Sequence, residues 1–135
     1  ADMRNLTAIG IGDDSLEELR SYHSLEHVPY FEVIPVLQHW FSKLEAAGRI
    51  EIAVPDIMYC ATNLTGEKWF EMNSNIYGEV NPQGYWNQPQ DWHRSGFTKE
   101  SLMEILKAVG FRRIAFLEPR SDKGYAYEIR VEAFK

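Results

Sequence analysis

The chain has 135 residues, of which 44% are apolar and 25% are charged, and its formal net charge is −6. These values are typical of one globular domain with its own core. The acidic balance argues against general binding of nucleic acid, which requires a basic face, and no apolar run is long enough to cross a bilayer. The single cysteine, Cys60, cannot form an internal disulfide, so we expect a reducing, cytoplasmic location and neither a membrane nor a nucleic acid as partner.

The first 29 residues leave their secondary structure open. Gly10, Gly12 and the acidic pair after them indicate a loop. The next segment has two interpretations. A helix could begin after Ser15, which is a suitable cap, or residues 19–24 could form a short strand. The spacing of the apolar residues does not decide between them.

A helix and a strand are predicted next. Apolar side chains recur every three or four residues from 30 to 47, which predicts an amphipathic helix with Gly48 directly after its end. Ile50, Ile52 and Val54 then alternate with other residues and predict a strand, which ends at Pro55. Residues 57–97 combine aromatic residues with Asn, Gln, Gly and Pro. So long a connection predicts a lid or an insertion, with a short helix around residues 66–75.

The last third of the chain carries the clearest signals. Thr98 is placed to cap a helix that Gly110 ends. Residues 112–119 predict a strand, residues 121–124 a turn, and residues 125–134 an alternating strand. We therefore expect residues 1–135 to form one α/β domain whose mixed sheet ends in an antiparallel hairpin.

Four phrases of the sequence carry a family resemblance: ADMRNL, HSLEHV, VLQHWFSKLEAAGRIEIAVPD and HRSGFTKESLMEILKAVGF. Together they resemble the second half of class I S-adenosylmethionine-dependent methyltransferases, which have a three-layer Rossmann-like fold. The resemblance implies methyl transfer from S-adenosylmethionine to an oxygen or nitrogen of a small acceptor. The glycine-rich turn that holds the methionine part of the cofactor in this family is not among these phrases. We therefore expect a partial fold, with three alternatives: an amino-terminal half completes it within a larger protein, another chain completes it, for example in a homo-oligomer, or the cofactor site has been lost.

The resemblance also implies site residues. The acidic loop that binds adenine in the family matches Asp2 and Met3, and the end of the fourth strand places His23 and Ser24 near the cofactor. The same strand end gives the candidate catalytic residues His23, Glu26 and His27. In DWHRSGF, we expect an acceptor pocket lined by Trp92, His93 and Arg94. No metal ligands are assigned on this interpretation, but some members of the family bind a divalent metal through Glu or His residues in this region, so a metal stays open.

Two alternatives stay open. H-x-x-E-H fits an inverted zinc-protease signature, in which His23 and His27 would bind Zn²⁺ from one helix face, with Glu26 as base and Glu100 or Glu104 as third ligand. Pro29 disfavours a helix directly before it, which weakens this hypothesis. The other alternative is a non-catalytic α/β domain that binds a partner at an open sheet edge.

Overall fold

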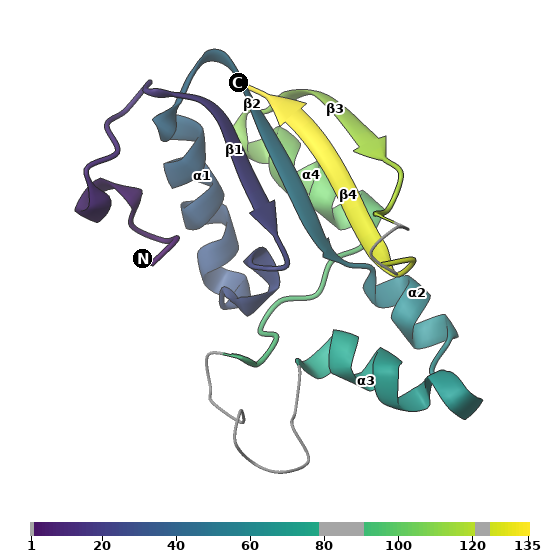
Figure 1. Cartoon of the computed structure of the whole chain (residues 1–135). Coiled ribbons are helices and arrows are strands. Elements are labelled where there is room, and N and C mark those ends of the chain that lie inside the picture. The colour runs from purple at the N-terminus through teal and green to yellow at the C-terminus, as the bar shows by residue number, and fades with distance from the viewer. Residues whose placement is uncertain (1, 79–90, 121–124) are drawn as a thin grey trace.

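A computed structural model describes residues 2–78, 91–120 and 125–135. Within these residues four strands form one mixed sheet in the order β1-β2-β4-β3. The strands are β1 (Leu16–Tyr22), β2 (Leu44–Pro55), β3 (Arg112–Leu117) and β4 (Glu128–Phe134). β1 and β2 run parallel, whereas β4 is antiparallel to both β2 and β3 (Figure 1). The predicted α/β class, the mixed sheet and the terminal hairpin are confirmed.

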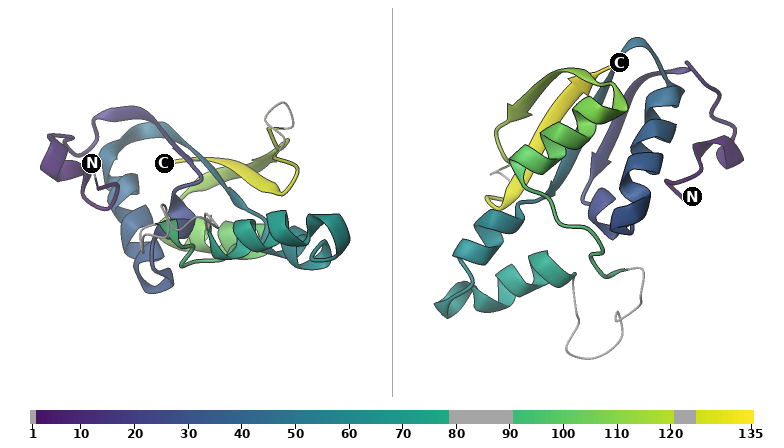
Figure 2. Two further views of the ribbon diagram at one scale, coloured as in Figure 1. Left: turned by 60° about the horizontal axis from the view of Figure 1, so that its bottom comes forward. Right: turned by 180° about the vertical axis from the view of Figure 1, so that it is seen from behind.

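The helices fall into two groups. α1 (Val33–Lys43) and α4 (Lys99–Val109) cover the same face of the sheet, as the view from behind shows (Figure 2). α2 (Ile57–Thr62) and α3 (Trp69–Tyr77) lie beyond the carboxyl end of β2 (Figure 1). Short 3₁₀ turns complete the described elements: Leu6–Ile9, Leu25–His27, Tyr30–Glu32 and Gly66–Lys68. In the described part of the chain, no helix combines the length and the apolar character that a membrane crossing needs.

The two faces of the sheet differ in chemistry. Ile50, Ile52 and Val54 of β2 belong to the hydrophobic core with residues of α1 and α4, as their alternation predicts. The residues between them point to the other face, where Glu51 forms ion pairs with Arg49 and Arg130. The described residues therefore form the sheet and one layer of helices, with a charged second face.

β1 is a strand, which settles the first open question. It pairs with β2 in parallel, with Leu19 beside Ile50 and Tyr22 beside Ala53. Local sequence could not decide this because the pairing partner lies about thirty residues further along the chain. β1 is an edge strand: no described residue pairs with its outer side.

The predicted end of the first helix is wrong. α1 ends at Lys43, and Leu44 is already extended and pairs with Leu16. Gly48 does not have the left-handed backbone that a glycine at a helix end adopts. The positive φ in this segment, 64°, belongs to Ala47. A Cβ at Gly48 would lie 2.9 Å from the carbonyl oxygen of Glu45 and 3.0 Å from that of Leu16. Gly48 therefore allows close backbone packing rather than helix termination.

The last helix is confirmed, and the last strand is shorter than predicted. Thr98 and Ser101 form a reciprocal capping box at the start of α4, and Gly110 ends it with φ 119°. β4 begins at Glu128 rather than at Tyr125, because the Glu128 N–H donates to the Tyr125 carbonyl and closes a turn there. The predicted turn at residues 121–124 lies outside the described residues.

The segment 57–97 contains more regular structure than its composition indicates. Asp56 accepts hydrogen bonds from the backbone N–H groups of Met58 and Tyr59 and so caps α2, which the sequence did not reveal. The short helix predicted around residues 66–75 is present as a 3₁₀ turn followed by α3. Residues 79–90 lie outside the described residues, so the lid or insertion stays a prediction.

Candidate functional site

His23 stands at the carboxyl end of β1 and has a left-handed backbone with φ 48°, which is uncommon for a residue other than glycine. Its backbone N–H still donates to the Ala53 carbonyl of β2, at 2.8 Å. The imidazole lies between two carboxylates: Nε2 is 2.8 Å from Glu128 and Nδ1 is 3.4 Å from Glu26. The backbone therefore leaves the strand at a residue whose imidazole is held by two acidic side chains.

The carboxylates also set the protonation of this histidine. Burial lowers the pKa of His23, but the hydrogen bonds with Glu26 and Glu128 outweigh burial and raise that pKa above its ordinary value. Burial conversely raises the pKa of Glu128, while hydrogen bonds from Arg120 and His23 bring it below its usual range. Each partner of this pair therefore stabilises the charged form of the other.

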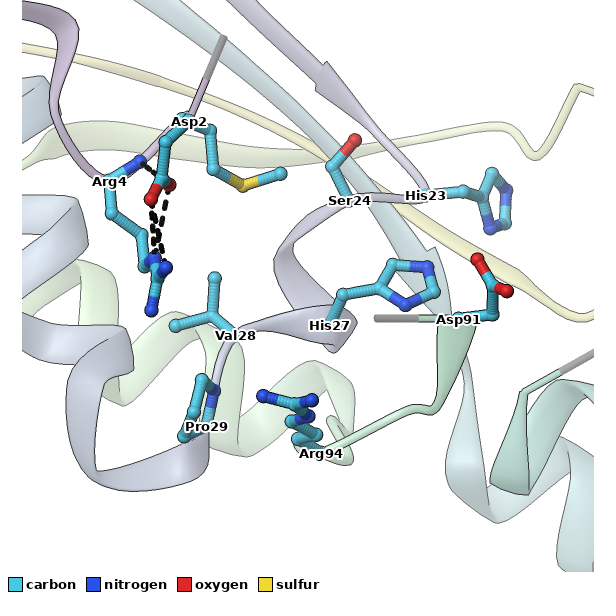
Figure 3. A pocket seen from close by; sticks show the side chains of 10 residues that line it. Asp2, Arg4, His23, Ser24, His27, Val28, Pro29, Asp91 and Arg94 are labelled. Atoms are coloured by element: carbon cyan, nitrogen blue, oxygen red, sulfur yellow. Dashed lines mark hydrogen bonds and ion pairs between the residues drawn. The ribbon is translucent and has the colours of Figure 1, made fainter. Parts of the chain in front are cut away.

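A cavity of about 430 Å³ opens beside His23 on the side of the amino-terminal residues (Figure 3). It brings together six residues that the sequence selected separately: Asp2, Met3, His23, Ser24, His27 and Arg94. Figure 3 shows the Asp2 carboxylate held by the guanidinium of Arg4, at 2.8 Å. Hydrogen bonds from Arg4 lower the pKa of Asp2 to about 2.

A second cavity, of about 630 Å³, lies on the other side of His23. His23, His27 and Asp91 line both cavities, so these residues separate two adjoining spaces. The second cavity is further lined by Glu26, His93, Arg120, Tyr125 and Tyr127. The Tyr125 ring centroid lies 5.0 Å from that of His23, and burial raises the pKa of Tyr127 to about 12.

Glu26, His27 and His93 form a cluster between the turn after β1 and the segment before α4. The backbone carbonyl of Glu26 accepts hydrogen bonds from the N–H groups of Arg94 and Ser95, at 2.7 and 3.1 Å, which ties the two segments together. The rings of His27 and His93 meet edge to face, with centroids 4.9 Å apart. Burial lowers the pKa of His93.

The zinc-protease hypothesis fails on geometry. Leu25–His27 is a single 3₁₀ turn, and His23 precedes it with a left-handed backbone. The H-x-x-E-H motif therefore does not lie on an α-helix, which its ligand spacing requires.

The three residues predicted to line an acceptor pocket do not lie together in the structure. His93 lines the second cavity, whereas Arg94 lines the first. The Trp92 side chain is 45% exposed and is not among the described residues that line either cavity. Trp92 instead contributes its backbone carbonyl, 3.3 Å from His27 Nδ1.

Sequence reasoning missed Glu128, Arg120 and the two tyrosines. The alternation of the last strand puts Glu128 on the face opposite Ile129 and Val131, but it does not reveal that the Glu128 side chain is fully buried against His23 and Arg120. One signal was present in the sequence. The last strand runs antiparallel to its neighbour, so its first residue must lie at the carboxyl edge of the parallel strands.

No protein-family model matches the sequence, and no curated protein matches it either. Solved structures do match. A SAM-dependent methyltransferase from Archaeoglobus fulgidus superimposes with a TM-score of 0.62 and 14% identity, over 100% of this chain and 66% of that chain. A second one, from Methanosarcina mazei, gives 0.61 and 16% identity, over 93% of this chain and 62% of that chain.

A third structure is the Burkholderia thailandensis 1,6-didemethyltoxoflavin-N1-methyltransferase with its bound substrate and S-adenosylhomocysteine. Its TM-score is 0.60 at 19% identity, over 92% of this chain and 45% of that chain. The chain has the class I S-adenosylmethionine-dependent methyltransferase fold. It spans less than two thirds of the length of each of these three chains.

In open α/β sheets, ligands bind outside the carboxyl ends of the parallel strands. His23 and both cavities lie at that edge of this methyltransferase fold.

Proposed function

We propose that this chain is the carboxyl-terminal part of an S-adenosylmethionine-dependent methyltransferase that acts on an oxygen or nitrogen of a small acceptor. The observation that carries the proposal is the position of His23. It stands at the carboxyl end of β1 with one cavity on each side, so a cofactor and an acceptor could approach each other there. Pockets of a few hundred Å³ are of the size that binds small molecules.

The residues around the first cavity fit one side of a nucleoside site. The Ser24 hydroxyl donates to the Tyr22 carbonyl at 3.1 Å, so its oxygen remains able to accept a hydrogen bond. Asp2 pairs with Arg4 at the surface, where an ion pair contributes little and can exchange for a ligand hydroxyl or amine. Met3 is partly buried and supplies apolar surface. S-adenosylmethionine, when bound, supplies a methyl group on a positively charged sulfur.

The second cavity fits an acceptor that loses a proton. Nε2 of His23 is hydrogen-bonded to Glu128 at 2.8 Å, whereas the contact of Nδ1 with Glu26 is longer, 3.4 Å. In the neutral ring, Nδ1 is therefore the atom that would take the proton from an acceptor O–H or N–H. The resulting imidazolium lies between the carboxylates of Glu26 and Glu128, which stabilise its charge. Glu128 in turn is held by Arg120 at 2.7 Å, so the ring orientation is fixed before the acceptor binds.

The proposal is tested on the full-length protein by calorimetry with S-adenosylhomocysteine, followed by a screen for transfer of a radiolabelled methyl group to small acceptors. We expect His23→Gln to keep cofactor binding and to lower kcat by about 10²-fold or more, the usual contribution of a general base. His39→Gln is the matched control, because His39 accepts a hydrogen bond from the Leu6 N–H at 2.9 Å, away from both cavities. Absence of binding, or full activity of His23→Gln, would contradict the proposal.

The alternative of a non-catalytic partner-binding domain stays a prediction. Its structural basis is the edge of β1, which pairs with no other described strand on its outer side. A protein that binds no S-adenosylhomocysteine but retains a partner through this edge would favour it. The cytoplasmic location also stays a prediction, resting on Cys60, which is a free and buried thiol.

A further inference from the structure

Three side chains at the second cavity are arranged as metal ligands. Glu26, His27 and His93 each offer one ligand atom, and these atoms lie within 4.8 Å of one another. Two of the residues belong to the turn after β1, and the third comes from the segment before α4. Only the fold brings them together, because 65 residues separate His27 from His93 in the sequence.

Both histidines have their second ring nitrogen fixed. The partners of the Nδ1 atoms are backbone carbonyls, which only accept hydrogen bonds, so each Nδ1 must carry the proton and donate. His27 Nδ1 donates to the Trp92 carbonyl at 3.3 Å, and His93 Nδ1 donates to the Asn75 carbonyl at 2.8 Å. The neutral rings therefore present their Nε2 lone pairs. This arrangement is usual for histidines that bind metals, since the carbonyl fixes the tautomer and the orientation of the ring.

Glu26 supplies an independent indication of a ligand. The residue is 2% exposed, and its Oε1 faces His23. Its Oε2 is buried and has no hydrogen-bond partner among the described residues. Leaving a buried carboxylate oxygen without a partner is costly, so native structures rarely do so without an ion or a water. A cation held by the two histidines would satisfy this oxygen.

We propose that Glu26, His27 and His93 bind one divalent transition-metal ion, with Zn²⁺ the best match. Two imidazoles and one carboxylate form a ligand set that suits Zn²⁺ and neighbouring first-row metals, whereas Mg²⁺ and Ca²⁺ prefer oxygen ligands. Atoms that share a Zn²⁺ at about 2.1 Å lie within about 4.2 Å of one another. Small side-chain movements therefore close the site.

The open side of the ion would face the cavity of about 630 Å³, which all three ligands line. Three protein ligands leave a coordination position for a water or for an oxygen or nitrogen atom of a bound molecule. The site would thus give the second cavity a further means of fixing a polar ligand. Metal binding of this kind does not depend on the proposed methyl transfer.

The test is a titration of metal-free protein with Zn²⁺ in competition with a chromophoric chelator. We expect one equivalent to bind, and Glu26→Gln and His93→Gln to weaken binding by about 100-fold or more, since even residues that only orient the ligands usually contribute 10- to 100-fold. His39→Gln is the control, because it removes an imidazole elsewhere and should leave the affinity unchanged. Co²⁺ should give an absorption spectrum of nitrogen and oxygen coordination that both site variants lose.

A second measurement protects the test against misfolding. Zn²⁺ should raise the Tm of the wild type and of His39→Gln, because an ion that binds only the folded state stabilises that state. It should not raise the Tm of His93→Gln, whose changed side chain is only half-buried. The proposal is overturned if one equivalent does not bind, if both site variants bind like the wild type, or if His39→Gln weakens binding equally.

Discussion

Replacing the Glu51 carboxylate by an amide tests how the face of the sheet opposite α1 and α4 is stabilised. The Glu51 side chain is 3% exposed, and its carboxylate receives Arg130 Nε at 2.6 Å, Arg49 Nη2 at 2.7 Å and the Tyr22 hydroxyl at 2.9 Å. Burial alone raises the pKa of Glu51. The three hydrogen bonds outweigh burial and lower that pKa from 4.5 to about 2.

The magnitude follows from linkage between proton binding and folding. At about 1.4 kcal/mol for each pH unit, this fall of the pKa corresponds to about 3 kcal/mol of folding free energy. Because the folded-state pKa is lowered, this stability is fully present above pH 4.5. It is lost as the pH falls from 4.5 toward about 2.

We therefore expect Glu51→Gln to be less stable than the wild type by about 3 kcal/mol at pH 7, with the difference narrowing steadily below pH 4.5. Urea denaturation at a series of pH values measures both quantities. Comparing two proteins at each pH removes the contribution of the other acidic groups. Glu45→Gln is the control, because Glu45 lies on the same strand and is exposed.

Two results would refute this reasoning. Suppose that the free energy of unfolding of Glu51→Gln were within about 1 kcal/mol of the wild-type value at pH 7. The ion pairs of Glu51 would then do little more than offset the desolvation cost of the buried carboxylate. If the difference stayed constant between pH 5 and pH 2.5, the low pKa would not be the source of the stability. An equal loss in Glu45→Gln would point to net charge rather than to the ion pairs.

Two further predictions concern the ends of secondary structure. Thr98→Ala should destabilise the protein by about 1 kcal/mol because it removes the acceptor for the Ser101 N–H. Thr98→Ser keeps a hydroxyl at this position and should keep most of the stability. Urea denaturation measures both variants, and an equal loss of stability in the two would contradict the capping role. Gly48→Ala should cost about 1–3 kcal/mol, because its Cβ would press on the carbonyls of Glu45 and Leu16. Gly12→Ala, where the space around a Cβ is open, should change the free energy of unfolding by less than about 0.5 kcal/mol, and similar effects at both glycines would show that packing is not the cause.

The sequence by itself determined the elements whose signals are local. Thr98 marks the start of α4 and Gly110 marks its end, because a capping side chain and a left-handed glycine act on the backbone within one turn. The alternation of Ile50, Ile52 and Val54 identified a strand with one apolar face, since successive side chains of a strand point to opposite sides. The family phrases predicted the methyltransferase fold, which the solved structures support. They also predicted a site at the end of β1, and that stays a prediction.

Only the tertiary structure decided what depends on contacts between distant residues. β1 became a strand because β2 lies beside it, and Gly48 is needed because two backbones meet there. Glu128 lies at His23 because β4 runs antiparallel to β2. Glu26, His27 and His93 form one cluster because the segment before α4 hydrogen-bonds to the turn after β1. Such pairings are set by packing and by hydrogen bonds across the fold, and no local pattern in the sequence carries that information.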